Sequence, residues 1–360
     1  MLPSPAATTP RTVYRRCGID AESSNLSHDF PLLQTEQKEL KLGTSMSTPV
    51  RGNPIIRRTA EELIKSMTSR LYIVDVFAER PYTGNQLAVV VGSRNLSGEI
   101  MQQVAAEMNY SETTFVDSTP EPDGGYRVRI FTPAREIAFA GHPILGTAWV
   151  VRNHLTLGDS EPVYLNLKVG RVPVTFECTA SDGEIAWFLA PPITPGPTCD
   201  RERIAAALGI TLDDIETRYP VQKYTAGTSA MIVPVRGLDA LRRSRLDLAA
   251  FAPLASEGFP ALVYVYCTET HQQGNDLCAR FFFDAHGVRE DPATGNGAAF
   301  LGAYLLEHVS SSETALSLRI EQGYELRRPS LVRLRARMVG LTRKVHVGGR
   351  VIPTVQGDLL

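Results

Sequence analysis

The 360-residue sequence lacks any apolar run that approaches the roughly 18–20 residues that a membrane-spanning helix needs. Its N-terminus also lacks the basic-then-apolar order of a secretory signal. Neither sign of charge is in excess, because 37 Lys and Arg stand against 39 Asp and Glu, a formal net charge of −2. These absences predict a cytoplasmic protein, and they give no electrostatic reason to expect nucleic acid or a membrane as partner.

Cysteine is scarce, and none of the five cysteines belongs to a CxxC pair. An odd number at wide spacing indicates neither a disulfide framework nor a zinc knuckle, and it favours a reducing compartment. Motifs for metal, nucleotide and serine-hydrolase chemistry are missing too, since there is no HExxH, EF-hand loop, Walker A or GxSxG. We therefore expect no metal and no cofactor.

The composition, 43% hydrophobic and 21% charged, allows a full hydrophobic core. Residues 1–69 differ from the rest, because they are rich in Pro, Ser and Thr with little periodicity, and are predicted to form a poorly ordered extension. Four prolines in residues 191–197 predict a linker that continues neither a strand ladder nor a helix. Two lobes are therefore expected, 70–191 and 192–360, with the last strands free to return to the first lobe.

One stretch, residues 279–305, has an earlier echo in the chain. ARFFFDAHGVREDPATGNGAAFLGAYL and VRIFTPAREIAFAGHPILGTAWVV both run from an apolar strand through a turn into a small-residue helix start. YTGNQLAVVV from Tyr82 likewise resembles YTAGTSAMIV from Tyr224. Repeats at this separation favour one architectural unit used twice.

Apolar periodicity gives a coarse secondary structure for both expected lobes. It predicts helices over residues 97–108, 143–154, 201–208, 246–251 and 298–308, with short strands between them. Ser97 is a plausible N-cap for the first helix, whose apolar face would contain Ile100, Met101, Val104 and Met108. The expected class is α+β, with a ligand cleft between two lobes of matching element order.

Glu112 is the first candidate site residue, in the segment MNYSETTF that begins at Met108. A carboxyl group between the end of a helix and an apolar strand can have its pKa raised by desolvation, which suits a group that both takes and gives a proton. A glutamate that caps a helix or pairs at a strand edge is the alternative interpretation.

The second candidate is the segment FAGHP, with Gly141 and His142. Glycine lets the backbone approach a ligand, and free N–H groups at a helix start favour an anion such as a carboxylate. His142 adds a group that titrates near neutrality. An imidazole that merely caps the helix is the alternative.

The third candidate is the segment EDPATGNG, which supplies Asp291 and another glycine-lined helix start at Gly295 and Asn296. It is not a dinucleotide fingerprint, because the third glycine is missing at the required interval. An acid that stabilises the helix N-terminus is the alternative.

Four ordered motifs together resemble the phenazine-biosynthesis PhzF-like family: VDVFAERPYTGNQLAVVV, MNYSETTFV, FTPAREIAFAGHPILGTA and EDPATGNGAAFLGAYL. The resemblance runs from about residue 71 to the C-terminus. It implies the diaminopimelate-epimerase-like fold, with two pseudosymmetric lobes, each a small barrel-like, mostly antiparallel sheet around a central helix. The active site of that fold lies between the lobes.

By the same resemblance, Glu112 matches the catalytic acid/base in the family's SET motif. Gly141 and His142 match the GHP site, Asp291 matches the acid of the EDP motif, and Gly295 lies in the second helix-start loop. These matches imply a substrate held between two helix starts beside a carboxyl group that moves a proton.

The sequence departs from the family's patterns at two places. Asn296 stands where the phenazine enzyme usually has serine, so hydrogen bonding there is altered. The epimerase branch uses two cysteines at the paired helix starts, where this chain has Ala140 or Gly141 and Thr294. A two-thiol epimerisation is therefore not expected.

The resemblance implies a cofactor-independent isomerase that relocates a proton on a small carboxylated substrate, with Glu112 as general acid/base and His142 and Asp291 orienting the substrate. A racemase or epimerase that uses carboxyl groups is the nearest enzymatic alternative. A catalytically silent small-ligand-binding protein on the same fold is the other. The resemblance also favours a homodimer.

Overall fold

The computed structural model describes residues 69–156, 162–283, 290–309 and 315–359. The first part of the chain contains β1 (Ser69–Val76), β2 (Asn85–Val91), η1 (Ser93–Asn95), α2 (Gly98–Met108), β3 (Glu112–Val116), β4 (Tyr126–Phe131), β5 (Glu136–Ile137), α3 (Gly141–His154), β6 (Val163–Leu167), β7 (Gly170–Thr179), β8 (Gly183–Leu189) and β9 (Thr194–Cys199). The predicted extension lies outside the described residues, apart from Ser69, which opens β1.

The rest of the chain contains α4 (Arg201–Leu208), η2 (Leu212–Asp214), β10 (Val221–Ala226), β11 (Thr228–Pro234), α5 (Leu238–Arg243), α6 (Leu248–Ser256), β12 (Leu262–Cys267), β13 (Leu277–Phe283), β14 (Glu290–Asp291), α7 (Gly295–His308), β15 (Ala315–Gln322), β16 (Ser330–Val339), β17 (Thr342–Gly349) and β18 (Val351–Leu359). The predicted helices correspond to α2, α3, α4, α6 and α7. The short helix α5 was not predicted.

The strand pairings follow one order twice. β1–β2 is antiparallel, β2–β3 parallel, β3–β4 antiparallel and β4–β6 parallel, followed by antiparallel β6–β7 and β7–β8. The same alternation runs through β10–β11, β11–β12, β12–β13, β13–β15, β15–β16 and β16–β17. Both predicted echoes fall on equivalent strands, since β2 matches β11 and β4 matches β13. The α+β class with two pseudosymmetric halves is confirmed.

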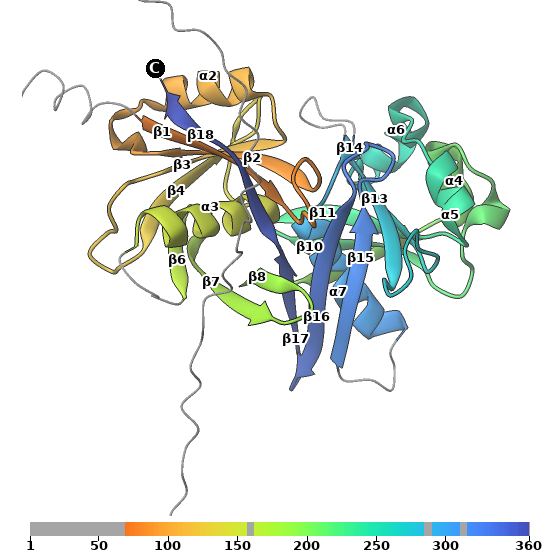
Figure 1. The fold of residues 1–360 in the computed structure, drawn as a ribbon. Helices are drawn as coiled ribbons and strands as arrows, with labels where there is room; N and C mark the ends of the chain where they lie inside the picture. Colours follow the sequence, from red (N-terminus) through yellow and green to blue (C-terminus); the bar gives the residue numbers. More distant parts are fainter. Residues whose placement is uncertain (1–68, 157–161, 284–289, 310–314, 360) are drawn as a thin grey trace, which may run out of the picture. The chain divides into compact units, whose positions relative to one another are not determined.

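Each half surrounds one central helix (Figure 1). Strands β1, β2, β3, β6 and β8 contact α3, and strands β10, β11, β15, β16 and β17 contact α7. The halves are joined where β8 pairs antiparallel with β17. After that junction, β9 pairs with β10 and β18 pairs with β1, so each half receives an edge strand from the other.

The proline-rich segment is a strand in part, which corrects the prediction that it could not continue a ladder. Thr194–Cys199 forms β9, and Pro195 stands opposite Tyr224 of β10 at a register shift. Proline is tolerated here because β9 pairs with a single described strand, as an edge strand does. The side chain of Gln222 donates to the Gly196 carbonyl at 2.9 Å and reinforces the irregular pairing.

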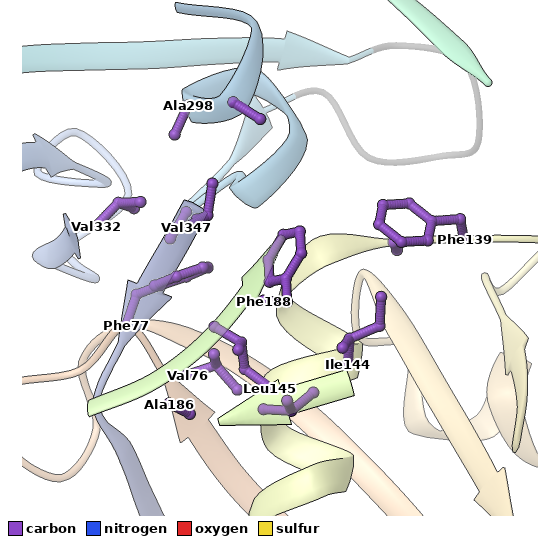
Figure 2. Close-up of a cluster of buried hydrophobic side chains, with 14 of the residues drawn as sticks. Val76, Phe77, Phe139, Ile144, Leu145, Ala186, Phe188, Ala298, Val332 and Val347 are labelled. Carbon is purple, nitrogen blue, oxygen red and sulfur yellow. The ribbon is translucent and has the colours of Figure 1, made fainter. Parts of the chain in front are cut away.

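The hydrophobic core lies around the two central helices (Figure 2). Ile144 and Leu145 of α3 are buried near Val76, and Phe188 of β8 lies between them and the side chains around α7. Full burial of each such side chain contributes about 1.5–3 kcal/mol relative to exposure. Glycine within the helices lets the strands pack closely, because a Cβ at Gly146 would come within 2.6 Å of Leu87 Cδ2.

The outer helix α2 confirms its predicted cap and, in Met101 and Val104, part of its predicted face. Ser97 Oγ accepts a hydrogen bond from the Ile100 amide at 3.2 Å, as an N-cap does. The buried face consists of Met101 and Ala105, whereas Ile100 is 43% exposed. The prediction placed Ile100 on the wrong side because it counted apolar residues and gave small alanine no weight.

Two expectations that came from features scarce in the sequence concern membrane-spanning helices and cysteines. Among the described residues, no helix combines the length and apolar character needed to cross a membrane. Cys199, Cys267 and Cys278 are buried free thiols.

Candidate functional site

A cavity of about 930 Å³ lies at the N-termini of α3 and α7 and is lined by residues from both halves of the chain. Its volume falls within the usual range of small-molecule pockets, about 300–1,000 Å³. All six residues singled out in the sequence line it: Glu112, Gly141, His142, Asp291, Gly295 and Asn296. None of the cysteines in the described part of the chain is among its lining residues.

The starts of α3 and α7 touch each other at two glycines. A Cβ built on Gly141 would lie 3.0 Å from Gly295 Cα, and a Cβ on Gly295 would lie 3.1 Å from Gly141 Cα. The ring of Phe188 is 3.2 Å and 3.5 Å from the same two positions. Both glycines are therefore needed for the close approach of the two helices, a role that the sequence did not predict for them.

Neither central helix has a side-chain cap, in contrast to α2, α4 and α6. Ser97, Asp200 and Asp247 accept backbone hydrogen bonds at the starts of α2, α4 and α6. The N-caps of α3 and α7, Ala140 and Thr294, accept none. Both helices thus begin at the cavity with uncapped N–H groups and the positive end of the helix dipole, an arrangement that favours a bound anion.

Glu112 opens β3 and is buried, with 8% of its surface exposed. Its carboxylate accepts no hydrogen bond from the described residues, and its nearest polar neighbour is His142, with 3.5 Å between Oε2 and Nε2. Burial, and to a lesser extent the charge of Asp291, raise the pKa of Glu112 well above its usual value. The side chain neither caps a helix nor pairs closely at the strand edge.

His142 lies in the first turn of α3 and is almost fully buried. Burial lowers its pKa to about 3, against a smaller opposing effect of a hydrogen bond with the Gln86 backbone. The imidazole is therefore neutral at neutral pH, so its contact with Glu112 is not an ion pair there. A neutral ring can position a polar group and exchange a hydrogen bond with Glu112.

Asp291 is also buried, but its carboxylate is held by three side chains. It accepts hydrogen bonds from Thr294 Oγ1 at 2.5 Å, Asn85 Nδ2 at 2.8 Å and Ser111 Oγ at 3.1 Å. Burial raises its pKa to about 6, and these hydrogen bonds limit the rise. The pKa of Asp291 thus lies close to neutral pH, while the three hydrogen bonds fix the position of its carboxylate.

Four further residues complete this network. Asn85, Ser111 and Gln322 were not singled out in the sequence, and Thr294 was noted only as the residue at a cysteine position of the epimerase branch. Asn85 Nδ2 lies 3.2 Å from His142 Nδ1 and 2.9 Å from the Ala293 carbonyl. Gln322 donates to the Asp291 carbonyl at 2.8 Å and accepts from the Thr294 amide at 3.1 Å. Asn85 and Gln322 could have been found in the sequence, because each is a polar residue at one end of an apolar strand, as in NQLAVVV and ALSLRIEQ.

The fold and the cavity together define a class of protein. A duplicated α+β unit places two uncapped helix starts and two buried carboxyl groups with raised pKa values around one small-molecule cavity. Carboxyl groups tuned by burial can take and give protons, and the helix starts can bind an anionic ligand. These features are typical of an enzyme with a small-molecule substrate.

Comparison with known proteins gives the family. The sequence pattern of the phenazine biosynthesis-like protein family, PhzC-PhzF, matches residues 74–357. The chain belongs to this family. An uncharacterised isomerase of Mesorhizobium japonicum is 34% identical over 302 residues, which cover 81% of this chain and 99% of that protein. A trans-2,3-dihydro-3-hydroxyanthranilate isomerase of Pseudomonas aeruginosa is 36% identical over 279 residues, which cover 75% and 91%. This chain is likewise an isomerase.

Solved structures agree on the fold. The PhzF-family phenazine biosynthesis protein of Bacillus anthracis matches with a TM-score of 0.76 at 24% identity, over 81% of this chain and 99% of that one. A protein of Pseudomonas aeruginosa described as a predicted epimerase matches with a TM-score of 0.68 at 31% identity, over the same shares. A probable proline racemase of Agrobacterium radiobacter, 12% identical, shares the fold alone, with a TM-score of 0.55 over 81% of this chain and 93% of that one.

Proposed function

We propose that the protein relocates a proton on a small carboxylated substrate without a cofactor, with Glu112 as the general acid/base. The Glu112 carboxylate takes a proton from a carbon of the substrate, and the resulting carboxylic acid returns it to another carbon while the double bond moves. His142 and Asp291 orient the substrate, and the starts of α3 and α7 bind its carboxylate.

One observation carries this assignment. Among the described carboxyl groups that line the cavity, Glu112 combines burial, a raised pKa and a lack of hydrogen-bond donors. Asp291 is held by three donors, and Glu136 is paired with Arg129 and Lys168, which hold its pKa at about 2. A general acid/base works best when its pKa lies near the operating pH and its proton is free to move.

The substrate class follows from the cavity and the relatives. Uncapped helix starts at Gly141 and Gly295 suit a carboxylate, and the lining aromatic rings of Phe139, Phe281 and Phe300 suit an unsaturated ring. The Pseudomonas aeruginosa relative is named for such an acid, trans-2,3-dihydro-3-hydroxyanthranilate. We therefore propose an unsaturated cyclic amino acid or a close analogue as substrate.

Epimerisation by carboxyl groups is the second candidate. Two buried carboxyl groups with raised pKa values share the cavity, so one could remove a proton and the other return it on the opposite face of the same carbon. The similar structure described as a predicted epimerase supports keeping this possibility. A thiol-based version is disfavoured by the residues at the helix starts, Ala140, Gly141 and Thr294.

A solvent-isotope experiment separates these functions. The protein is incubated in D₂O with trans-2,3-dihydro-3-hydroxyanthranilate and a panel of cyclic amino acids, and the products are followed by proton NMR. Deuterium entry with a moved double bond supports isomerisation, whereas entry with inverted configuration at one carbon supports epimerisation. No deuterium entry across the panel, together with saturable binding, would replace both with a ligand-binding role.

A further inference from the structure

A second group of potential ligands lies away from the cavity, in the half of the chain that contains α7. His271, Cys278 and Glu321 each place one donor atom, a ring nitrogen, a sulfur and a carboxylate oxygen, within 4.8 Å of the other two. Cys278 and Glu321 are each only 1% exposed. None of the three residues lines the 930 Å³ cavity.

The backbone brings these residues together although they are far apart in sequence. Cys278 of β13 and Glu321 of β15 are direct register partners in a parallel pair, so their side chains lie on the same side of the sheet. His271 lies in the loop between β12 and β13, and its backbone amide donates to Glu321 at 2.6 Å. Figure 1 shows β13 and β15 beside each other.

The imidazole of His271 is held in place while one of its nitrogens lacks a partner. Its ring stacks on Tyr324 with 3.9 Å between centroids and 3° between planes. Nδ1 lies 3.3 Å from the guanidinium of the exposed Arg242. Nε2 is buried and makes no hydrogen bond with any described residue. A buried polar atom without a partner costs about 1–3 kcal/mol, so a ligand at Nε2 would remove a real penalty.

We propose that His271, Cys278 and Glu321 form a binding site for one zinc ion. Zinc is the common metal for a mixed set of imidazole, thiolate and carboxylate ligands. β12 places Cys267 opposite Cys278, so a second thiol is available to complete four-coordination. Donor atoms around a tetrahedral zinc lie about 3.3–3.7 Å apart, given bonds of about 2.0–2.3 Å. The group therefore contracts by about 1 Å on binding, through a loop residue and rotatable side chains.

The surroundings favour a cation. The carboxylates of Glu269, Glu321 and Glu325 contribute negative potential at Cys267, and Glu321 and Glu325 do so at Cys278. Zinc would offset this negative potential, and its binding would release the proton of the Cys278 thiol.

Zinc binding would keep the hydrogen bonds of Glu321 and would change the contact between His271 and Arg242. Glu321 accepts hydrogen bonds from the amides of His271 and Gln272 and from the Asn275 side chain, which order the loop and leave one lone pair, on Oε2, for a metal. Coordination through Nε2 places the ring proton on Nδ1, so the exposed Arg242 must turn away. Zinc would thereby fix the loop to β15.

The test is zinc titration of the full-length protein after treatment with a chelator, by isothermal calorimetry. We expect one zinc per chain with a dissociation constant of about 1 μM or lower. His271→Gln and Cys278→Ser should each weaken binding by at least about tenfold. With Co²⁺ in place of zinc, the wild type should show a thiolate-to-cobalt charge-transfer band that Cys278→Ser lacks.

Cys199→Ser is the matched control, because Cys199 is a buried free thiol elsewhere in the fold, and it should bind zinc like the wild type. Circular dichroism checks that each variant is folded. His271 is only partly buried, so His271→Gln keeps the test valid if Cys278→Ser unfolds. Absence of binding in the wild type, or binding that neither ligand substitution weakens, would overturn the proposal.

Discussion

The starts of α3 and α7 are equivalent in the repeated fold but differ in how they hold their acidic neighbour. At α3, Glu112 approaches His142 only at 3.5 Å and has no hydrogen-bond donor among the described residues. At α7, Asp291 accepts three side-chain hydrogen bonds. The two carboxyl groups occupy different places in the repeat, since Glu112 opens β3 and Asp291 lies in β14 directly before α7, and one is unrestrained while the other is held.

This difference suggests how a duplicated scaffold divides the work of one site. A carboxyl group without donors has its pKa raised mainly by burial and can exchange its proton with a ligand. A carboxyl group with three donors keeps a fixed geometry and a smaller rise in pKa. We infer that Glu112 supplies the proton chemistry, while Asp291, together with His142, supplies the orientation.

Glu112→Gln should have the largest effect. It keeps the shape of the side chain but removes the exchangeable proton, so turnover should fall by about 10²–10⁴-fold or more, while folding and ligand binding remain nearly intact. The measurement is kcat with the substrate identified in the isotope assay, together with calorimetric binding of a non-reactive analogue.

Glu136→Gln is the matched control for that substitution. Glu136 also lines the cavity, but it is paired with Arg129 and Lys168 and its pKa is about 2. It should therefore keep most of the activity. Full activity in Glu112→Gln, or an equal loss in the two variants, would remove the distinction between the unrestrained acid and its neighbours.

Asp291→Asn should change the dependence of stability on pH. The pKa of Asp291 is about 6 in the folded protein against 3.8 ordinarily, a difference of roughly 2 units or about 3 kcal/mol. Because the folded-state pKa is the higher one, the wild type should lose up to that much stability as the pH rises from about 4 to above 6. The variant should lack this component.

Urea unfolding of both proteins at pH 4 and pH 7 measures this effect. The change in unfolding free energy between the two pH values is compared between wild type and Asp291→Asn, so that contributions from titrating groups away from the cavity largely cancel. The variant also lacks the charge that helps to raise the pKa of Glu112, so both effects reduce its pH dependence. An identical change in the two proteins would show that Asp291 ionises in the fold as it does in the unfolded chain.

Gly141→Ala and Gly295→Ala test the contact between the two helix starts. Each added methyl would lie only 3.0–3.1 Å from the other glycine, and such overpacking costs about 1–3 kcal/mol. Alanine's higher helix propensity offsets up to about 1 kcal/mol of this cost.

Gly357→Ala is the control, since a Cβ there meets nothing within 4 Å. It should change stability by no more than about 0.5 kcal/mol. Thermal unfolding of the three variants compares them, and equal effects would show that the helices can separate freely.

Much of the architecture was predictable from the sequence, because the duplication left matching motifs. The echoes at Val128 and Ala279, and at Tyr82 and Tyr224, fall on strands with equivalent pairings. The motifs around Glu112, His142 and Asp291 also lead to one cavity. These motifs could be recognised from the sequence because each is a short local pattern where a helix and a strand meet.

The supporting contacts were not predictable, because they join residues that are distant in the chain. Asn85 and Asp291 are hydrogen-bonded across 206 positions. The glycine contact between α3 and α7 likewise depends on how the two halves meet. β9 was missed for a different reason, since proline excludes a central strand but not an edge strand beside β10.

The central claim is that Glu112 moves the proton and Asp291 holds the geometry. The most direct test is the rate of deuterium entry from D₂O into the same substrate, measured side by side for Glu112→Gln and Asp291→Asn at saturating concentration. With these roles, deuterium entry should fall by about 10²–10⁴-fold or more in Glu112→Gln, and it should be slower but readily measurable in Asp291→Asn. Faster entry with Glu112→Gln than with Asp291→Asn would contradict these roles.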